Sequence, residues 1–201
     1  ISATQEKRKT LVELVQRIAA EINIPFTVGG GIKSKKEIES LLKAGADKVS
    51  LNSSIVKNPE LIREGAQAFG SQAIVAAIDA KYVGPHWEVF THGGTQATGL
   101  DALKWAQQCQ DNGAGELLVT SMDRDGTKSG FDHDLLRLIH NHTQIPLIAS
   151  GGAGTLEHCI EAIEKGKADA VLAASIFHFR EIEIHDLKLA MRKAGIPTRV
   201  I

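Results

Sequence analysis

The chain of 201 residues has a net charge of −1 and 43% hydrophobic residues, which is the composition of an ordinary globular domain. This charge balance implies no basic face for nucleic acid or for an anionic membrane. The longest uncharged apolar runs are too short to span a bilayer, and the two cysteines have neither metal-site nor disulfide spacing. We therefore expect a cytoplasmic protein that acts on small molecules and needs no metal ion or other cofactor.

Short apolar runs alternate with segments of helical periodicity along the whole chain. The predicted strands are 26–28, 48–51, 73–78, 116–120, 146–149 and 170–173, and the predicted helices are 4–21, 35–44, 60–69, 101–112, 133–141, 156–166 and 185–194. This alternation predicts an α/β fold with a parallel sheet. Residues 81–94 break the rhythm, because alternating Trp87, Val89 and Thr91 beside Gly84-Pro85 indicate an inserted β-hairpin.

Two stretches of the chain repeat each other at an offset of about 121 residues, the separation of Pro25 and Pro146. Residues 24–53 and 145–175 share the proline, paired glycines, an Ala-Asp-x-Val strand and a serine, with one inserted residue in the second copy. Two repeats of four strand–helix pairs would total roughly 240 residues, the size of a (βα)8 TIM barrel. We therefore predict that residues 1–201 form one barrel domain of two half-barrels that lacks its first strand, first helix and most of strand two. The alternative is a complete six-stranded doubly wound domain.

The C-terminal ends of the predicted strands are rich in glycine and polar residues, and this is the end that carries the active site in either parallel architecture. Glycines 29–31 and 151–152 occupy equivalent positions in the two copies, as do Asn52-Ser53 and Ala174-Ser175. Exposed backbone N–H groups in such turns bind anions, so the repeat predicts two phosphate sites and a substrate with a phosphate at each end. The alternative is that these glycines only form tight turns.

Three aspartates at these strand ends are candidates for contact with the substrate. Asp79 follows the most apolar strand, where partial burial of a carboxylate suits general acid or base catalysis. It could instead cap the next segment or pair with Lys81. Asp123 and Asp125 belong to an Asp-Arg-Asp-Gly turn without the spacing of a calcium loop, and they could simply form that turn.

Charged residues open two strands at their opposite, N-terminal ends. Asp47-Lys48 opens the second predicted strand, whose first residue is Lys48, and Glu116 begins the fourth. A salt-bridged plug, a docking surface for a partner or an ordinary solvated rim would each place charges there.

Six motifs carry a family resemblance across the chain. They are FTVGGGI (26–32), GADKVS (45–50), AIDAK (77–81), TSMDRDGTKSG (120–130), ASGGAG (149–154) and SIFHFRE (175–181). Together they resemble the cyclase subunit of imidazole glycerol phosphate synthase, from histidine biosynthesis. The resemblance implies a (βα)8 barrel that uses ammonia to cleave and cyclise phosphoribulosyl-formimino aminoimidazole carboxamide ribotide. The implied products are imidazole glycerol phosphate and aminoimidazole carboxamide ribotide.

The resemblance also implies roles for individual residues. Asp79 matches one of two catalytic aspartates, and the other would lie in the missing first strand. One substrate phosphate would be held by Gly31, Asn52 and Ser53, and the other by Gly126, Gly152, Ala174 and Ser175. Asp123 and Asp125 remain candidates for contact with the substrate.

The resemblance further implies a glutaminase partner that supplies ammonia at the bottom of the barrel. Lys48 and Glu116 match members of a charged gate there, and Asp47 would lie at the partner interface. Two alternatives remain open: a related sugar isomerase of the histidine pathway, which uses a similar bisphosphate substrate, and a binding scaffold without turnover.

Overall fold

The computed structural model describes the backbone of residues 2–200 and the side chains of residues 10–200. The chain forms two compact units, which are described separately. The first contains the chain up to Ala77 together with Cys109–Glu116, and the second contains Ile78–Gln108 and the chain from Leu117 onward. Strand β3 (Ile74–Tyr82), helix α5 (Ala102–Asp111) and strand β6 (Glu116–Ser121) have residues in both units.

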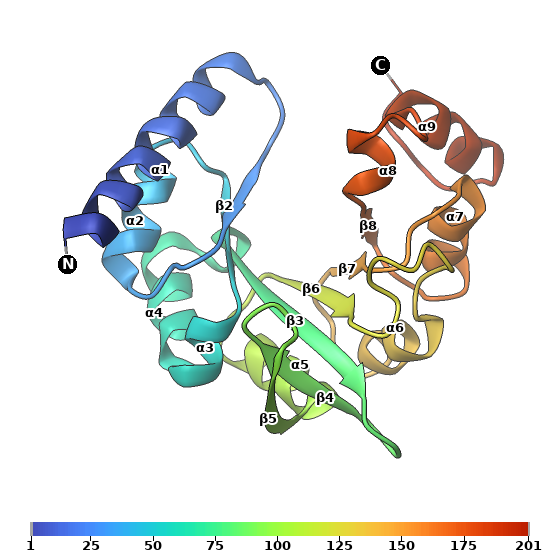
Figure 1. The fold of residues 1–201 in the computed structure, drawn as a ribbon, viewed down its shortest axis with the longest axis horizontal. Coiled ribbons are helices and arrows are strands. Elements are labelled where there is room, and N and C mark those ends of the chain that lie inside the picture. The colour runs from blue at the N-terminus through green and yellow to red at the C-terminus, as the bar shows by residue number, and fades with distance from the viewer. Residues whose placement is uncertain (1, 201) are drawn as a thin grey trace. The chain divides into compact units, whose positions relative to one another are not determined.

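The first unit packs helices against a parallel arrangement of β1, β2 and the first part of β3. Its other elements are α1 (Ser2–Glu21), β1 (Thr27–Gly29), α2 (Lys35–Lys43), β2 (Lys48–Leu51), α3 (Ser53–Lys57), α4 (Glu60–Phe69) and η1 (Ser71–Ala73). Val49 of β2 is in register with Val28 of β1 and with Ile74 of β3. Figure 1 shows α1, α2 and α4 on one side of β1 and β2. Apolar side chains of α2 and α4, including Ile38 and Ile62, are fully buried.

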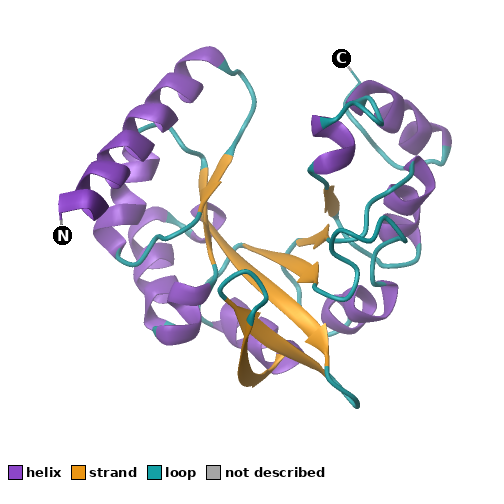
Figure 2. Ribbon diagram, viewed as in Figure 1, coloured by secondary structure: helices purple, strands orange, loops and turns teal. Residues whose placement is uncertain are grey.

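The second unit contains an antiparallel hairpin and a second parallel arrangement. Its elements after β3 are β4 (Trp87–Thr91), β5 (Gln96–Asp101), most of α5 and β6, then α6 (His133–His140), β7 (Leu147–Ser150), α7 (Leu156–Glu164), β8 (Ala170–Leu172), α8 (Ser175–His178) and α9 (Ile184–Lys193). β7 pairs in parallel with β6 and with β8. Figure 2 shows the alternation of strand, loop and helix from β6 to α9.

The predicted α/β class with parallel strands is confirmed, and the element order is consistent with a TIM-barrel-like fold. Each of the six predicted strands is present. The prediction that the third strand ends at Ile78 is wrong, because the strand continues to Tyr82, where it pairs with β4. The predicted hairpin at 81–94 is present and is longer than expected, since β5 pairs with β4 as a further antiparallel strand. The short helices α3 and α8 were not predicted.

The sequence repeat has a counterpart in local structure. The carboxylate of Asp47, just before β2, accepts a hydrogen bond from the backbone N–H of Phe26 at 2.9 Å. Asp169, just before β8, accepts one from the N–H of Leu147 at 2.8 Å. The unpredicted helices α3 and α8 also begin at matching residues, Ser53 and Ser175. In both copies an aspartate therefore ties the start of one strand to the start of its neighbour.

No helix in the described part of the chain is both long and apolar enough to cross a membrane.

Candidate functional site

The sequence predicts that Asp79 follows the third strand. In the structure Asp79 lies within that strand, β3. Its side chain is half-buried, whereas its neighbours Ile78 and Ala80 are fully buried. Because successive side chains of a strand point to opposite faces, Asp79 faces away from the side on which these neighbours are packed. It pairs in register with Phe90 of β4. The hairpin thus extends the strand that carries the candidate catalytic carboxylate.

The loop after β6, residues 122–132, is attached to the end of β3. The N–H of Met122 donates to the carbonyl oxygen of Ala80 at 2.8 Å, and the N–H of Tyr82 donates to Oδ2 of Asp123 at 2.7 Å. The carboxylate of Asp123 therefore has a structural contact with the end of β3, and not within its own turn. Asp125 is exposed, and its backbone N–H donates to the carbonyl oxygen of Ser121 at 2.9 Å.

The first predicted phosphate site, in the first unit, has open space above its glycines. Gly31 has φ of +69°, and a Cβ built there would have no atom within 4 Å. Asn52 precedes α3, and its Oδ1 is buried with no hydrogen-bond partner among the described residues. Because the oxygen and nitrogen of an amide are assigned from their partners, the unsatisfied atom marks an amide end that a bound donor or acceptor could engage.

The second predicted site, in the second unit, is more tightly packed. The N–H of Gly130 donates to the carbonyl oxygen of Gly152 at 2.8 Å, so the loop after β6 lies against the end of β7. Gly126 belongs to that loop and is exposed. Lys128 in the same loop forms an ion pair with Glu181, with Nζ to oxygen distances of 2.6 and 2.7 Å. This pair joins the loop to the turn after α8, the helix that follows Ala174 and begins at Ser175.

The charged residues at the strand starts of the first unit contact one another. Lys48, at the start of β2, forms an ion pair with Glu116, at the start of β6. The two side chains are 28% and 19% exposed, so the pair is partly shielded from solvent. Of the three interpretations of these charges, the salt bridge fits this geometry. Asp47 is exposed, and its carboxylate is already engaged by Phe26.

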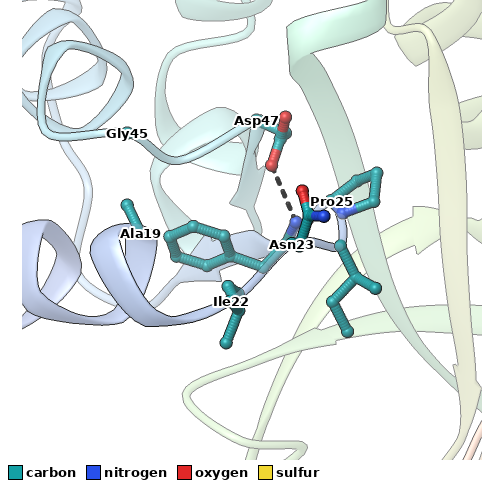
Figure 3. Close-up of a pocket in the computed structure, with 8 residues that line it drawn as sticks. Ala19, Ile22, Asn23, Pro25, Gly45 and Asp47 are labelled. Carbon is teal, nitrogen blue, oxygen red and sulfur yellow. Dashed lines mark hydrogen bonds between the residues drawn. The ribbon is translucent and has the colours of Figure 1, made fainter.

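An open pocket of about 350 Å³ lies beside Asp47, at the opposite end of β1 from Gly31 (Figure 3). It is lined by Ala19, Ile22, Asn23, Ile24, Pro25, Phe26, Gly45 and Asp47. Ile22 and Ile24 are 36% and 60% exposed. The pocket therefore lies away from the predicted phosphate site at Gly31 and presents apolar side chains beside a carboxylate.

Comparison with known proteins assigns this chain to a family. A family model described as "Histidine biosynthesis protein" matches residues 1–183. This chain belongs to the histidine biosynthesis protein family. It is 56% identical over 200 residues to the imidazole glycerol phosphate synthase subunit HisF of Flavobacterium psychrophilum, covering 100% of this chain and 80% of that protein. It is 57% identical over 199 residues to the protein of the same name from Cytophaga hutchinsonii, covering 99% and 79%.

One residue of this family member was missed by the sequence analysis. Asp132 precedes α6, and its side chain accepts hydrogen bonds from Ser121, Trp87 and the backbone of Leu135. Only its position before a helical segment, where aspartate is a favoured cap, signals it in the sequence. Among the described residues, no group of three or more His, Cys, Asp or Glu side chains is placed to hold a metal ion.

Proposed function

We propose that this chain is the cyclase subunit of an imidazole glycerol phosphate synthase and acts in histidine biosynthesis. The observation that carries the proposal is the identity of 56–57% with two proteins of that name, over practically the whole chain. The reaction is the ammonia-dependent cleavage and cyclisation of phosphoribulosyl-formimino aminoimidazole carboxamide ribotide. It releases imidazole glycerol phosphate and aminoimidazole carboxamide ribotide.

Asp79 is the general acid/base of the reaction. Its half-buried position on β3 supports this role, because a carboxylate held on a strand between packed neighbours has a fixed orientation. Ring closure requires that protons be removed from the attacking nitrogen and delivered to the leaving oxygen. A carboxylate at the reacting centre can carry out both transfers in turn. Asp123 and Asp125, on the neighbouring loop, contact the substrate.

The substrate carries one phosphate at each end, so two phosphate sites are needed. Gly31, Asn52 and Ser53 bind the first phosphate, which is supported by the open space at Gly31 and by the unsatisfied amide of Asn52. The second phosphate is bound by the matching residues of the other copy, which are Gly152, Ala174 and Ser175, together with Gly126 of the loop after β6. Support comes from the same turn geometry, since Gly31 and Gly152 both have positive φ.

The partner is a glutaminase subunit that delivers ammonia. The word "subunit" in the relatives' names supports a complex. The partner docks on the face formed by Asp47 and the apolar pocket beside it, and ammonia enters at Lys48 and Glu116. All of these residues lie in one unit at the N-terminal ends of strands, which supports a common surface.

The decisive experiment measures consumption of the formimino ribotide with ammonia. Asp79→Asn keeps the size of the side chain but removes the proton-transferring group, so turnover should fall at least 100-fold while the substrate still binds. Asp111→Asn, at the exposed end of α5, is the matched control and should retain full activity. Undiminished turnover in Asp79→Asn would reject the catalytic assignment. Isomerisation of the aminoaldose precursor without ammonia would favour the isomerase instead.

The ammonia route is tested by comparing two nitrogen sources. Lys48→Ala should lower glutamine-dependent turnover with the glutaminase more than turnover with free ammonia. Lys43→Ala removes an exposed lysine from α2 and should change neither rate. If Lys48→Ala reduces both rates equally, Lys48 has no role in delivery.

A further inference from the structure

Asp132 is the meeting point of three structural elements in the second unit. Its Oδ2 accepts a hydrogen bond from Oγ of Ser121 at 3.0 Å and another from Nε1 of Trp87 at 3.2 Å. Its Oδ1 accepts one from the N–H of Leu135 at 3.1 Å, which caps helix α6. The three donors come from the end of β6, from the start of β4 and from the first turn of α6.

The contact between Ser121 and Asp132 closes the loop that carries Asp123, Asp125 and Gly126. Ser121 is only 2% exposed, so its hydroxyl needs a partner within the protein, and Asp132 provides it. The carbonyl oxygen of the same serine accepts the N–H groups of Arg124 and Asp125, at 3.2 and 2.9 Å. Ser121 therefore anchors the turn through its backbone and the far end of the loop through its side chain.

The hairpin is fastened to the same loop at two points. Tyr82 and Trp87 are a register pair of β3 and β4, and their rings meet edge to face with centroids 5.1 Å apart. The N–H of Tyr82 donates to Asp123 near the start of the loop, and the indole of Trp87 donates to Asp132 at its end. Asp123 and Asp132, at the two ends of the loop, thus each hold one residue of the Tyr82–Trp87 pair. This pair lies beyond Asp79, where β3 and β4 form the hairpin.

We propose that Asp132 is a positioning residue for the cyclase reaction. Through Ser121 and Trp87 it fixes the loop 122–132 and the hairpin as one assembly, so that the substrate-contacting part of the loop keeps its place relative to Asp79. This inference rests on the proposed function and adds a residue to it. A network of this kind is stronger than separate bonds, because one carboxylate accepts hydrogen bonds from three elements and its Oδ2 is shared by two of them.

The test separates loop positioning from helix capping. Asp132→Ser retains a good N-cap for α6 but is too short to reach both Ser121 and Trp87. We expect kcat/KM for the formimino ribotide to fall about tenfold, the change that loss of one to two net hydrogen bonds produces. The KM for ammonia should hardly change. The urea midpoint should fall, because the buried hydroxyl of Ser121 loses its partner, but the variant should remain folded under the assay conditions. Trp87→Phe retains the ring and removes one donor, so it should give a smaller loss of the same kind.

The matched control is Asp134→Ser, two residues along α6 on its exposed surface. It should leave kcat/KM unchanged. Adding Ser121→Ala to Asp132→Ser should cost little beyond the single change, because both remove the same contact. If Asp132→Ser stays within twofold of the unsubstituted protein, or if its loss only follows the unfolded fraction, Asp132 is not a positioning residue. Absence of turnover in the unsubstituted protein and in Asp134→Ser would refute the proposed function instead.

Discussion

The two matching glycines Gly31 and Gly152 should respond very differently to substitution by alanine. Gly31 has φ of +69° and open space around a built Cβ, so Gly31→Ala pays only for the left-handed backbone, about 1–2 kcal/mol. Gly152 has φ of +107°, and its Cβ would lie 2.2 Å from the carbonyl oxygen of Gly130. Strained backbone costs about 1–3 kcal/mol and overpacking costs about 1–3 kcal/mol more. We expect Gly152→Ala to be less stable than Gly31→Ala by about 2 kcal/mol or more.

Urea denaturation of the two variants, followed by circular dichroism at matched slopes, measures this difference. The KM for the ribotide should show the reverse order, with the larger change expected in Gly31→Ala. The new methyl of Gly31→Ala projects into the open space at the predicted phosphate site, so the KM for the ribotide should rise in a protein that is still folded. Equal losses of stability in the two variants would refute the reasoning, because the conflict with Gly130 would then have no energetic consequence.

Three other predictions concern buried or bonded groups. Asp169→Ala should cost about 1–2 kcal/mol in urea denaturation, since the N–H of Leu147 loses its acceptor, and an unchanged midpoint would show that water replaces the carboxylate. Burial raises the pKa of Cys109 to about 12 and of Cys159 to about 11, so at pH 8 at most about one thiol in a thousand is ionised. Ellman's reagent should therefore label them only after unfolding, and rapid labelling of the folded protein would contradict this. Burial also lowers the pKa of His133 below its usual 6.5, so the unfolded chain binds a proton first and stability falls as the pH drops through 6.5. His133→Gln should reduce that loss, and an NMR titration of His133 above 6.5 would overturn the assignment.

The sequence was sufficient to predict elements whose local pattern agrees with their packing. β2 and α4 begin and end at the predicted residues, because an apolar run and an amphipathic helix are each bounded by residues that stop them. The start of α2 was equally readable: Ser34 accepts the N–H of Glu37 at 3.4 Å, and Glu37 accepts the N–H of Lys33 at 2.6 Å. The ion pair of Lys48 and Glu116 was among the predicted readings, although the partners are far apart in the chain.

The features that were missed depend on contacts between distant segments. The extension of β3 past Asp79 has no local apolar signal, since Lys81 and Tyr82 are exposed and are held in the strand by β4. α3 is too short for a helical period to be recognised. Asp132 looks like an ordinary cap until the fold brings Trp87 and Ser121 to it. The neighbouring sequence is enough to infer that Asp132 caps a helix, but it does not indicate the partners of the other carboxylate oxygen.

Lys167 shows how the second copy accommodates its extra residue. The first copy leaves α2 through Gly45 and reaches Asp47 directly, whereas the second inserts Lys167 with φ of +63° before Asp169. Each connection contains one residue with positive φ, Gly45 in the first copy and Lys167 in the second, and in both copies the aspartate binds the start of the neighbouring strand. Two helix-to-strand connections of different length therefore end in the same aspartate contact. Transplanting the shorter connection into the second copy would shorten the protein by one residue while preserving its strand pairing, and length variation at this end need not disturb the loops that carry the chemistry.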